Sequence, residues 1–157
     1  MRKLYRITAQ GIVETLKSTL TTNARATRIL EKLNLANPKW GSGDRNTVHK
    51  ATYDILRWKS YYTFLANPKE DASEKEIHWE LLGVWLIIND LEVPDWEEFK
   101  NIDAKEIKAR QKEKTTAEIS KSMPYWLYEK GKAELSKEWN IELDALNLEA
   151  KLILRVN

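Results

Sequence analysis

The chain has 157 residues, of which 42% are hydrophobic and 10% aromatic, so it can bury one core and suits a single domain. It contains no cysteine, which excludes disulfides, thiolate metal ligands and a cysteine nucleophile. No apolar stretch approaches the roughly 18 residues of a membrane-spanning helix, and the N-terminus has no signal-peptide core. We therefore expect a cytoplasmic protein with no membrane partner.

The net charge of +2 hides a gradient along the chain. Residues 1–60 hold twelve basic and four acidic residues, giving +8, whereas the remainder holds fourteen and twenty, giving −6. Such an asymmetry indicates a polyanion partner for one face, for which RNA is the obvious candidate. The alternative is that these lysines and arginines only keep the helices soluble.

Apolar residues recur at helical spacing through the first third of the chain. They predict a helix over residues 5–21 and a second helix that Asn23 caps. The second helix should end at Asn37, because the proline that follows disfavours helical geometry there. Its outward positions carry three cations: Arg25, Arg28 and Lys32. After a glycine-containing loop over residues 38–44, Asp44 should cap a long helix that reaches Ala66.

The spacing Ser73-x-x-Glu76 is a capping box, and it predicts a helix to about residue 88 that is the most apolar of the chain and the centre of its core. A turn over residues 93–99 precedes a further helix, which Asp103 opens. Because residues 105–114 are mostly charged, this stretch suits either a solvated helix or a mobile linker.

Towards the C-terminus, Ser122 should cap a helix with Pro124 near its first turn, and Gly131 should interrupt that helix. A final helix runs through Leu135 and Leu146. Residues 151–157 form the one predicted strand. Because a single strand leaves its backbone groups unpaired, we expect partner strands beyond residue 157.

Two of these segments carry a resemblance to a known family. Residues 122–128 read Ser-Met-Pro-Tyr-Trp-Leu-Tyr, and residues 145–157 read Ala-Leu-Asn-Leu-Glu-Ala-Lys-Leu-Ile-Leu-Arg-Val-Asn. They resemble the pre-catalytic segment of the RNA (cytosine-5)-methyltransferases that modify ribosomal and transfer RNA. The resemblance implies a parent enzyme that uses S-adenosylmethionine and whose catalytic cysteines lie downstream. This chain alone should then be inactive and hold no cofactor.

A looser match lies earlier, in Pro38-Lys-Trp-Gly-Ser-Gly-Asp-Arg45 and Thr52-Tyr-Asp-Ile-Leu-Arg-Trp58. It resembles the N-terminal domain of many of these enzymes, which is similar to the RNA-binding antitermination factor NusB. The expected fold class is therefore all-α. We expect a NusB-like domain over residues 1–94, a charged helical connector over 95–121, and a pre-catalytic segment over 122–157 that ends in the first strand of an α/β subdomain.

Candidate RNA contacts follow from residue type and spacing. Lys50, Asp54, Arg57 and Tyr61 share one face of the predicted third helix, where two cations could contact phosphates and the tyrosine could stack on a base. A salt-bridged solvent face, with Asp54 pairing to a neighbour, is the alternative. Arg45 lies near the helix start, where it could bind a phosphate. The alternative is that it is a structural partner of Asp44 or of a buried carbonyl. Lys39 and Trp40 suit a splayed base, unless the tryptophan fills the core.

In the family the corresponding strand leads into a small α/β subdomain beside the catalytic domain, so the resemblance implies a role for Arg155 near the RNA path or the domain junction. The alternative is that Arg155 only alternates outward on a strand whose apolar residues pack inward. Trp58, Trp79, Trp85, Trp126 and Trp139 lie on apolar stripes and should anchor the core. His49 and His78 lack ligand spacing, so we expect no metal, and no catalytic residue is assigned. The predicted function is an RNA-positioning module that partners structured RNA, such as ribosomal RNA, and its own methyltransferase domain. A scaffold without RNA binding is the alternative.

Overall fold

The computed structural model describes residues 4–148 with the exception of Asn23. The described residues form helices and no strand, which confirms the all-α class. The predicted strand, with Arg155, lies outside them, as does the predicted cap Asn23. The elements are α1 (Arg6–Thr22), α2 (Ala26–Ala36), α3 (Ser42–Arg57), α4 (Lys59–Ala66), α5 (Glu74–Ile88), η1 (Glu97–Phe99), α6 (Ala104–Arg110), α7 (Ala117–Ser120), α8 (Tyr125–Leu135), η2 (Ser136–Glu138) and α9 (Trp139–Asn147).

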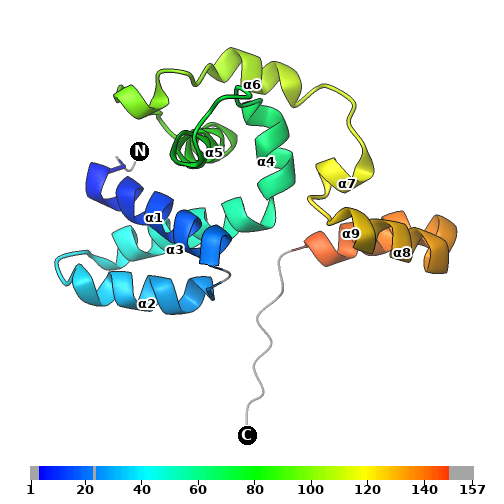
Figure 1. Ribbon diagram of the computed structural model, residues 1–157, viewed down its shortest axis with the longest axis horizontal. Coiled ribbons are helices and arrows are strands. Elements are labelled where there is room, and N and C mark those ends of the chain that lie inside the picture. The colour runs from blue at the N-terminus through cyan, green and yellow to red at the C-terminus, as the bar shows by residue number, and fades with distance from the viewer. Residues whose placement is uncertain (1–3, 23, 149–157) are drawn as a thin grey trace, which may run out of the picture. The chain divides into compact units, whose positions relative to one another are not determined.

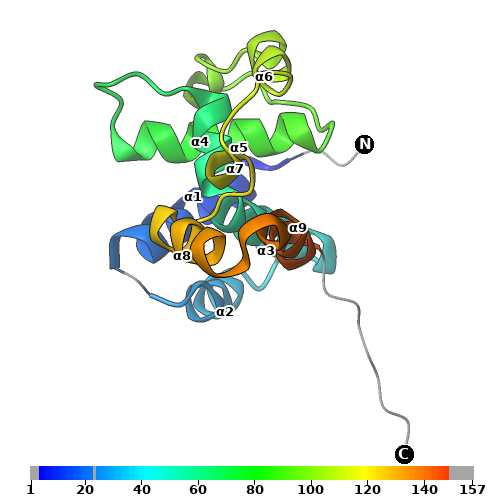
Figure 2. The same cartoon turned by 90° about the vertical axis from the view of Figure 1, so that its right-hand side faces the viewer.

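Contacts within the chain divide it into two units after Lys114. In the first unit α1 lies between α2 and α5 and also packs on α3, as Figure 1 shows. In the view of Figure 2, α5 is seen along its length, with α4 and α6 packed on it. None of the described helices is long and apolar enough to cross a membrane.

Helix α5 forms the centre of the first unit, as its sequence predicts. The capping box is present, because the Ser73 backbone N–H donates to Glu76 Oε2 (2.9 Å) and the Glu76 N–H donates to Ser73 Oγ (3.3 Å). Every residue from His78 to Ile87 is buried. A helix that is apolar on all sides must be covered on all sides, and here α1, α3, α4 and α6 cover it.

The predicted third helix is two helices. Helix α3 begins at Ser42, so Asp44 is not its cap but accepts a hydrogen bond from the Gly41 N–H (3.2 Å) as the third helical residue. It ends at Arg57, and α4 starts at Lys59. Neither glycine nor proline marks this break. It lets α3 and α4 each pack on α5, which is a tertiary requirement that local sequence does not encode.

The charged segment after residue 103 begins as a helix that is anchored to the first unit. The Asp103 carboxylate accepts from the Lys105 N–H (2.7 Å), which confirms it as the cap of α6. Ile107 is buried, and the Arg110 guanidinium donates to the Leu65 carbonyl (2.8 Å). The contacts therefore place α6 with the first unit, within the segment 95–121 that the sequence predicts as a connector.

The second unit is a hairpin of α8 and α9 preceded by the short α7. Ser122 does not cap α8, which begins at Tyr125; Ser122 lies two residues before Pro124 in a left-handed conformation (φ 49°). Nor does Gly131 interrupt α8. It is buried because Trp139 of α9 packs directly on it, and a Cβ there would lie 2.4 Å from two atoms of the indole ring.

Candidate nucleic-acid interface

The predicted contacts Lys39 and Arg45 are both exposed, on the α2–α3 loop and in the first turn of α3. Arg45 lines a shallow groove of about 440 Å³ between α2 and α3, with Glu31, Asn34, Leu35 and Pro38. The carboxylate of Asp44 already accepts one N–H at the start of α3. The start of α3 therefore carries its own anion, and the Arg45 side chain is the part of this turn that suits a phosphate.

Lys50 and Asp54 adopt the salt-bridged alternative. The Lys50 Nζ lies 3.8 Å from Asp54 Oδ2, and the same oxygen accepts a hydrogen bond of 2.9 Å from the Trp85 indole N–H. Asp54 thus fixes a buried ring of α5 and partly offsets the charge of Lys50. A lysine held in this way is a weaker phosphate contact than the sequence predicts.

Lys50 and Arg57 both lie on α3, seven residues apart, and keep the predicted shared face, whereas Tyr61 lies beyond the break, in α4. The Arg57 guanidinium lies over the ring of Trp58, 5.9 Å from its centroid. Tyr61 belongs to α4, where it is half-buried with its ring tilted against that of Tyr62. The Arg57 side chain remains exposed.

Trp40 belongs to the core and not to a base-binding loop. Its side chain is 7% exposed and packs over Gly11 of α1, where a Cβ would lie 2.8 Å from its ring. The core alternative is therefore correct for Trp40. The opposite error concerns Trp126, which the sequence predicts as a core anchor and which is 67% exposed on α8.

Two cations of α2, together with Arg25 immediately before it, extend the predicted contacts to a larger surface. Arg28 and Lys32 lie four residues apart and Leu35 follows three later, so the three share one exposed face of α2. That face borders the groove that Arg45 lines. We call the following set the basic surface: Arg25, Arg28, Lys32, Lys39 and Arg45. All five are exposed and none forms an ion pair within the described part of the chain.

The outward placement of the three cations on and just before α2 was predicted from the sequence. The contacts predicted residue by residue, however, did not include them and, apart from Arg155, lay on the loop after α2 and on the predicted third helix. Glu31 is the one acidic residue that lines the groove. The surface can therefore attract a polyanion, while Leu35, 82% exposed, and Pro38 offer apolar contacts beside the charges.

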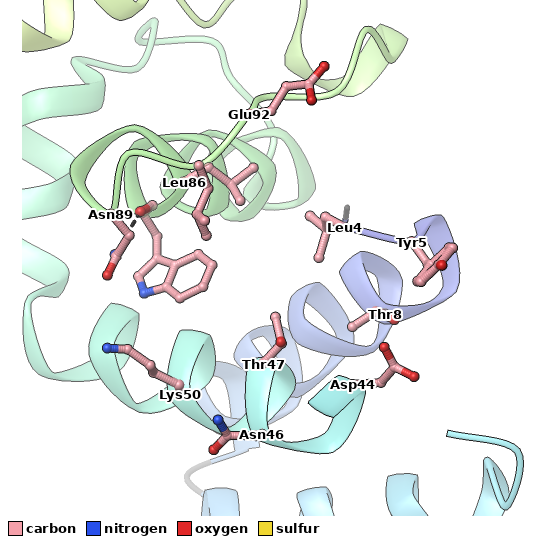
Figure 3. Close-up of a pocket in the computed structure, with 12 residues that line it drawn as sticks. Leu4, Tyr5, Thr8, Asp44, Asn46, Thr47, Lys50, Leu86, Asn89 and Glu92 are labelled. Atoms are coloured by element: carbon pink, nitrogen blue, oxygen red, sulfur yellow. Dashed lines mark hydrogen bonds between the residues drawn. The ribbon is translucent and has the colours of Figure 1, made fainter. Parts of the chain in front are cut away.

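A separate cavity of about 240 Å³ lies on the other side of α3, among α1, α3 and α5 (Figure 3). Leucines and the ring of Trp85 form much of its wall, and amide, hydroxyl and carboxylate groups come from α3 and from the residues after α5. Thr8 of α1 lines it, is 2% exposed, and its hydroxyl has no hydrogen-bond partner among the described residues.

The two histidines do not form a metal site with other residues. His49 Nε2 lies 2.9 Å from Asn34 Nδ2 in a hydrogen bond between α3 and α2. His78 is buried in α5, and burial lowers the pKa of its imidazole. Within the described ranges, no group of three or more histidine, aspartate or glutamate side chains could hold a metal ion.

Comparison with known proteins finds no counterpart: no family model, no curated protein and no solved structure matches this chain.

Proposed function

We propose that this chain is an RNA-binding module, and that the basic surface on α2 and the start of α3 holds the phosphate backbone. The observation that supports this proposal most strongly is the clustering of five exposed cations that lack ion-pair partners within the described residues. Cations that are not neutralised by neighbouring carboxylates can displace the counterions of a nucleic acid, which provides most of the affinity in such complexes.

The resemblance supports a more specific proposal, in which the module positions structured RNA for an RNA (cytosine-5)-methyltransferase domain. The helical first unit is compatible with a NusB-like domain in that role. S-adenosylmethionine would bind to the catalytic domain, and no residue of this chain is proposed to hold it. The contribution of the chain would be electrostatic attraction and orientation of the RNA.

Charge reversal tests the RNA-binding proposal. We expect Arg28→Glu with Lys32→Glu to weaken binding to small-subunit ribosomal RNA at least tenfold, measured by fluorescence anisotropy. The matched control is Lys105→Glu with Lys112→Glu, which makes the same change in net charge at exposed positions of the first unit that lie outside the basic surface. Equal losses in the two pairs would mean that net charge and not this surface determines binding.

A second candidate function is the scaffold, in which the chain docks on a methyltransferase domain without binding RNA. The second unit favours it, because Trp126 of α8, Ile141 of α9 and Leu148, which follows α9, are each at least 67% exposed. The scaffold predicts that Ile141→Ser with Leu148→Ser abolishes association with the separately expressed catalytic domain, and that the intact chain binds no RNA at low salt.

A further inference from the structure

The cavity among α1, α3 and α5 has the size and wall chemistry of a site for a small planar ligand. Its volume of about 240 Å³ is below the ~300–1,000 Å³ of pockets that hold drug-sized molecules. Leu4 and Leu86 lie on opposite sides of it in Figure 3, with Thr47 below them, and Trp85 also lines it. The Trp85 ring is held in place by its hydrogen bond to Asp54. Apolar walls with a fixed ring suit an aromatic ligand, which gains by stacking and by burial.

The cavity has several acceptor groups, beside the N–H donors of Asn46 and Lys50. Thr47 uses its hydroxyl proton in a bond to the Gly43 carbonyl (2.8 Å), and Asn89 uses an amide N–H in a bond to the Trp85 carbonyl (2.9 Å). Their oxygens remain as acceptors. Asp44 and Glu92 add carboxylates, of which only one oxygen of Asp44 forms a hydrogen bond within the described residues. A ligand that carries N–H donors at its edge would satisfy these groups.

Thr8 adds a polar group to the wall of the cavity. A hydroxyl that is buried without a partner costs about 1–3 kcal/mol, so a ligand that pairs with it gains that energy. Thr8 is in this state and lines the cavity.

The position of the cavity connects it with the proposed function, on which the following inference depends. Arg45 lies on the α2 side of α3, in the groove of the basic surface, whereas Asn46, Thr47 and Lys50 line the cavity. We propose that the cavity holds one unpaired base of an RNA whose phosphates contact the basic surface, and that it prefers bases with an exocyclic amino group. Adenine, cytosine and guanine present such N–H donors to carboxylate and amide oxygens, whereas uracil does not.

Free nucleosides test the cavity without involving the basic surface, because they carry no phosphate. In an NMR titration of the whole chain, adenosine, cytidine or guanosine should shift the Trp85 indole N–H, assigned with Trp85→Phe, and uridine should shift it at least fivefold less at equal concentration. Thr8→Val should weaken this binding at least fivefold while leaving the thermal unfolding temperature unchanged or higher, since valine keeps the shape and removes the unpaired hydroxyl.

Thr52→Val is the matched control, because Thr52 is also fully buried with an unpaired hydroxyl but does not line the cavity. It should leave nucleoside binding unchanged. If no nucleoside shifts the Trp85 signal while the chain still binds RNA in a salt-dependent way, the cavity inference is wrong and the RNA-binding proposal stands. Nucleoside binding without RNA binding would overturn the RNA-binding proposal and with it the claim that the bound base belongs to an RNA. Equal losses in the two threonine variants would overturn the role of Thr8.

Discussion

The placement of Trp40 in the core can be tested by an alanine substitution at Gly11. A Cβ at residue 11 would lie 2.8 Å from Cη2 of Trp40 and 3.0 Å from Cδ2 of Leu33, where carbon atoms prefer about 3.5–4.0 Å. Leu33 can rotate away, but the buried indole ring cannot do so easily. Alanine favours a helix over glycine by about 1 kcal/mol, whereas overpacking costs ~1–3 kcal/mol. We expect Gly11→Ala to lower the free energy of unfolding by about 1 kcal/mol.

A double-mutant cycle with Trp40→Leu measures the coupling between residues 11 and 40. Trp40→Leu alone should lower the free energy of unfolding by less than the ~3–5 kcal/mol of a tryptophan-to-alanine change. In that background the ring is gone, so Gly11→Ala should instead stabilise the protein, by up to about 1 kcal/mol. Urea unfolding followed by far-ultraviolet circular dichroism gives all four free energies. If Gly11→Ala has the same effect in both backgrounds, Trp40 does not pack on α1 and its assignment to the core is refuted.

Three further predictions concern buried groups. Asp54→Ala should lower the free energy of unfolding by about 1–3 kcal/mol, because it leaves the Trp85 indole N–H unpaired. Asp54→Asn keeps an acceptor and should lower it less. Chemical denaturation measures both values, and equal losses would contradict the hydrogen bond. Burial raises the pKa of the Glu80 carboxyl above its ordinary 4.5. The free energy of unfolding should therefore fall as the pH rises through the pKa of the folded state, because the buried carboxyl then becomes charged. Glu80→Gln should therefore gain stability over the wild type at neutral pH and lose that advantage in acid, whereas a pH-independent difference would contradict the shift. Gly131→Ala places a Cβ 2.4–2.5 Å from three ring atoms of Trp139 and should lower the unfolding free energy by ~1–3 kcal/mol; an unchanged midpoint would mean that α8 and α9 do not pack there.

Features that depend on a few neighbouring residues were predictable from the sequence. The capping box of Ser73 and Glu76 and the cap at Asp103 are local hydrogen-bond patterns, and both are confirmed. The bounds of α1 and α5 follow from hydrophobic periodicity and agree with the prediction to within about two residues.

Features that depend on tertiary contacts were not predictable. The break after Arg57 has no local signal, and it places Tyr61 on a different helix from the other residues of the predicted RNA-binding face. Gly131 looks like a helix breaker, but it serves the approach of Trp139 from another helix. Trp40 and Trp126 show the same limit for side chains: a tryptophan in a loop is buried, and one at the start of a helix is exposed. Sequence spacing alone does not tell which helical face another element covers.

The salt dependence of RNA binding by the intact chain tests the central claim most directly. Each phosphate contacted contributes about −0.7 to −0.9 to the slope of log K against log salt, so five contacts by the basic surface predict a slope of about −3.5 to −4.5. We expect that slope for small-subunit ribosomal RNA, and a slope shallower by about 1.4–1.8 for Arg28→Glu with Lys32→Glu. Absence of binding at low salt, or a slope that this pair of substitutions leaves unchanged, would contradict the assignment of the basic surface as an RNA interface.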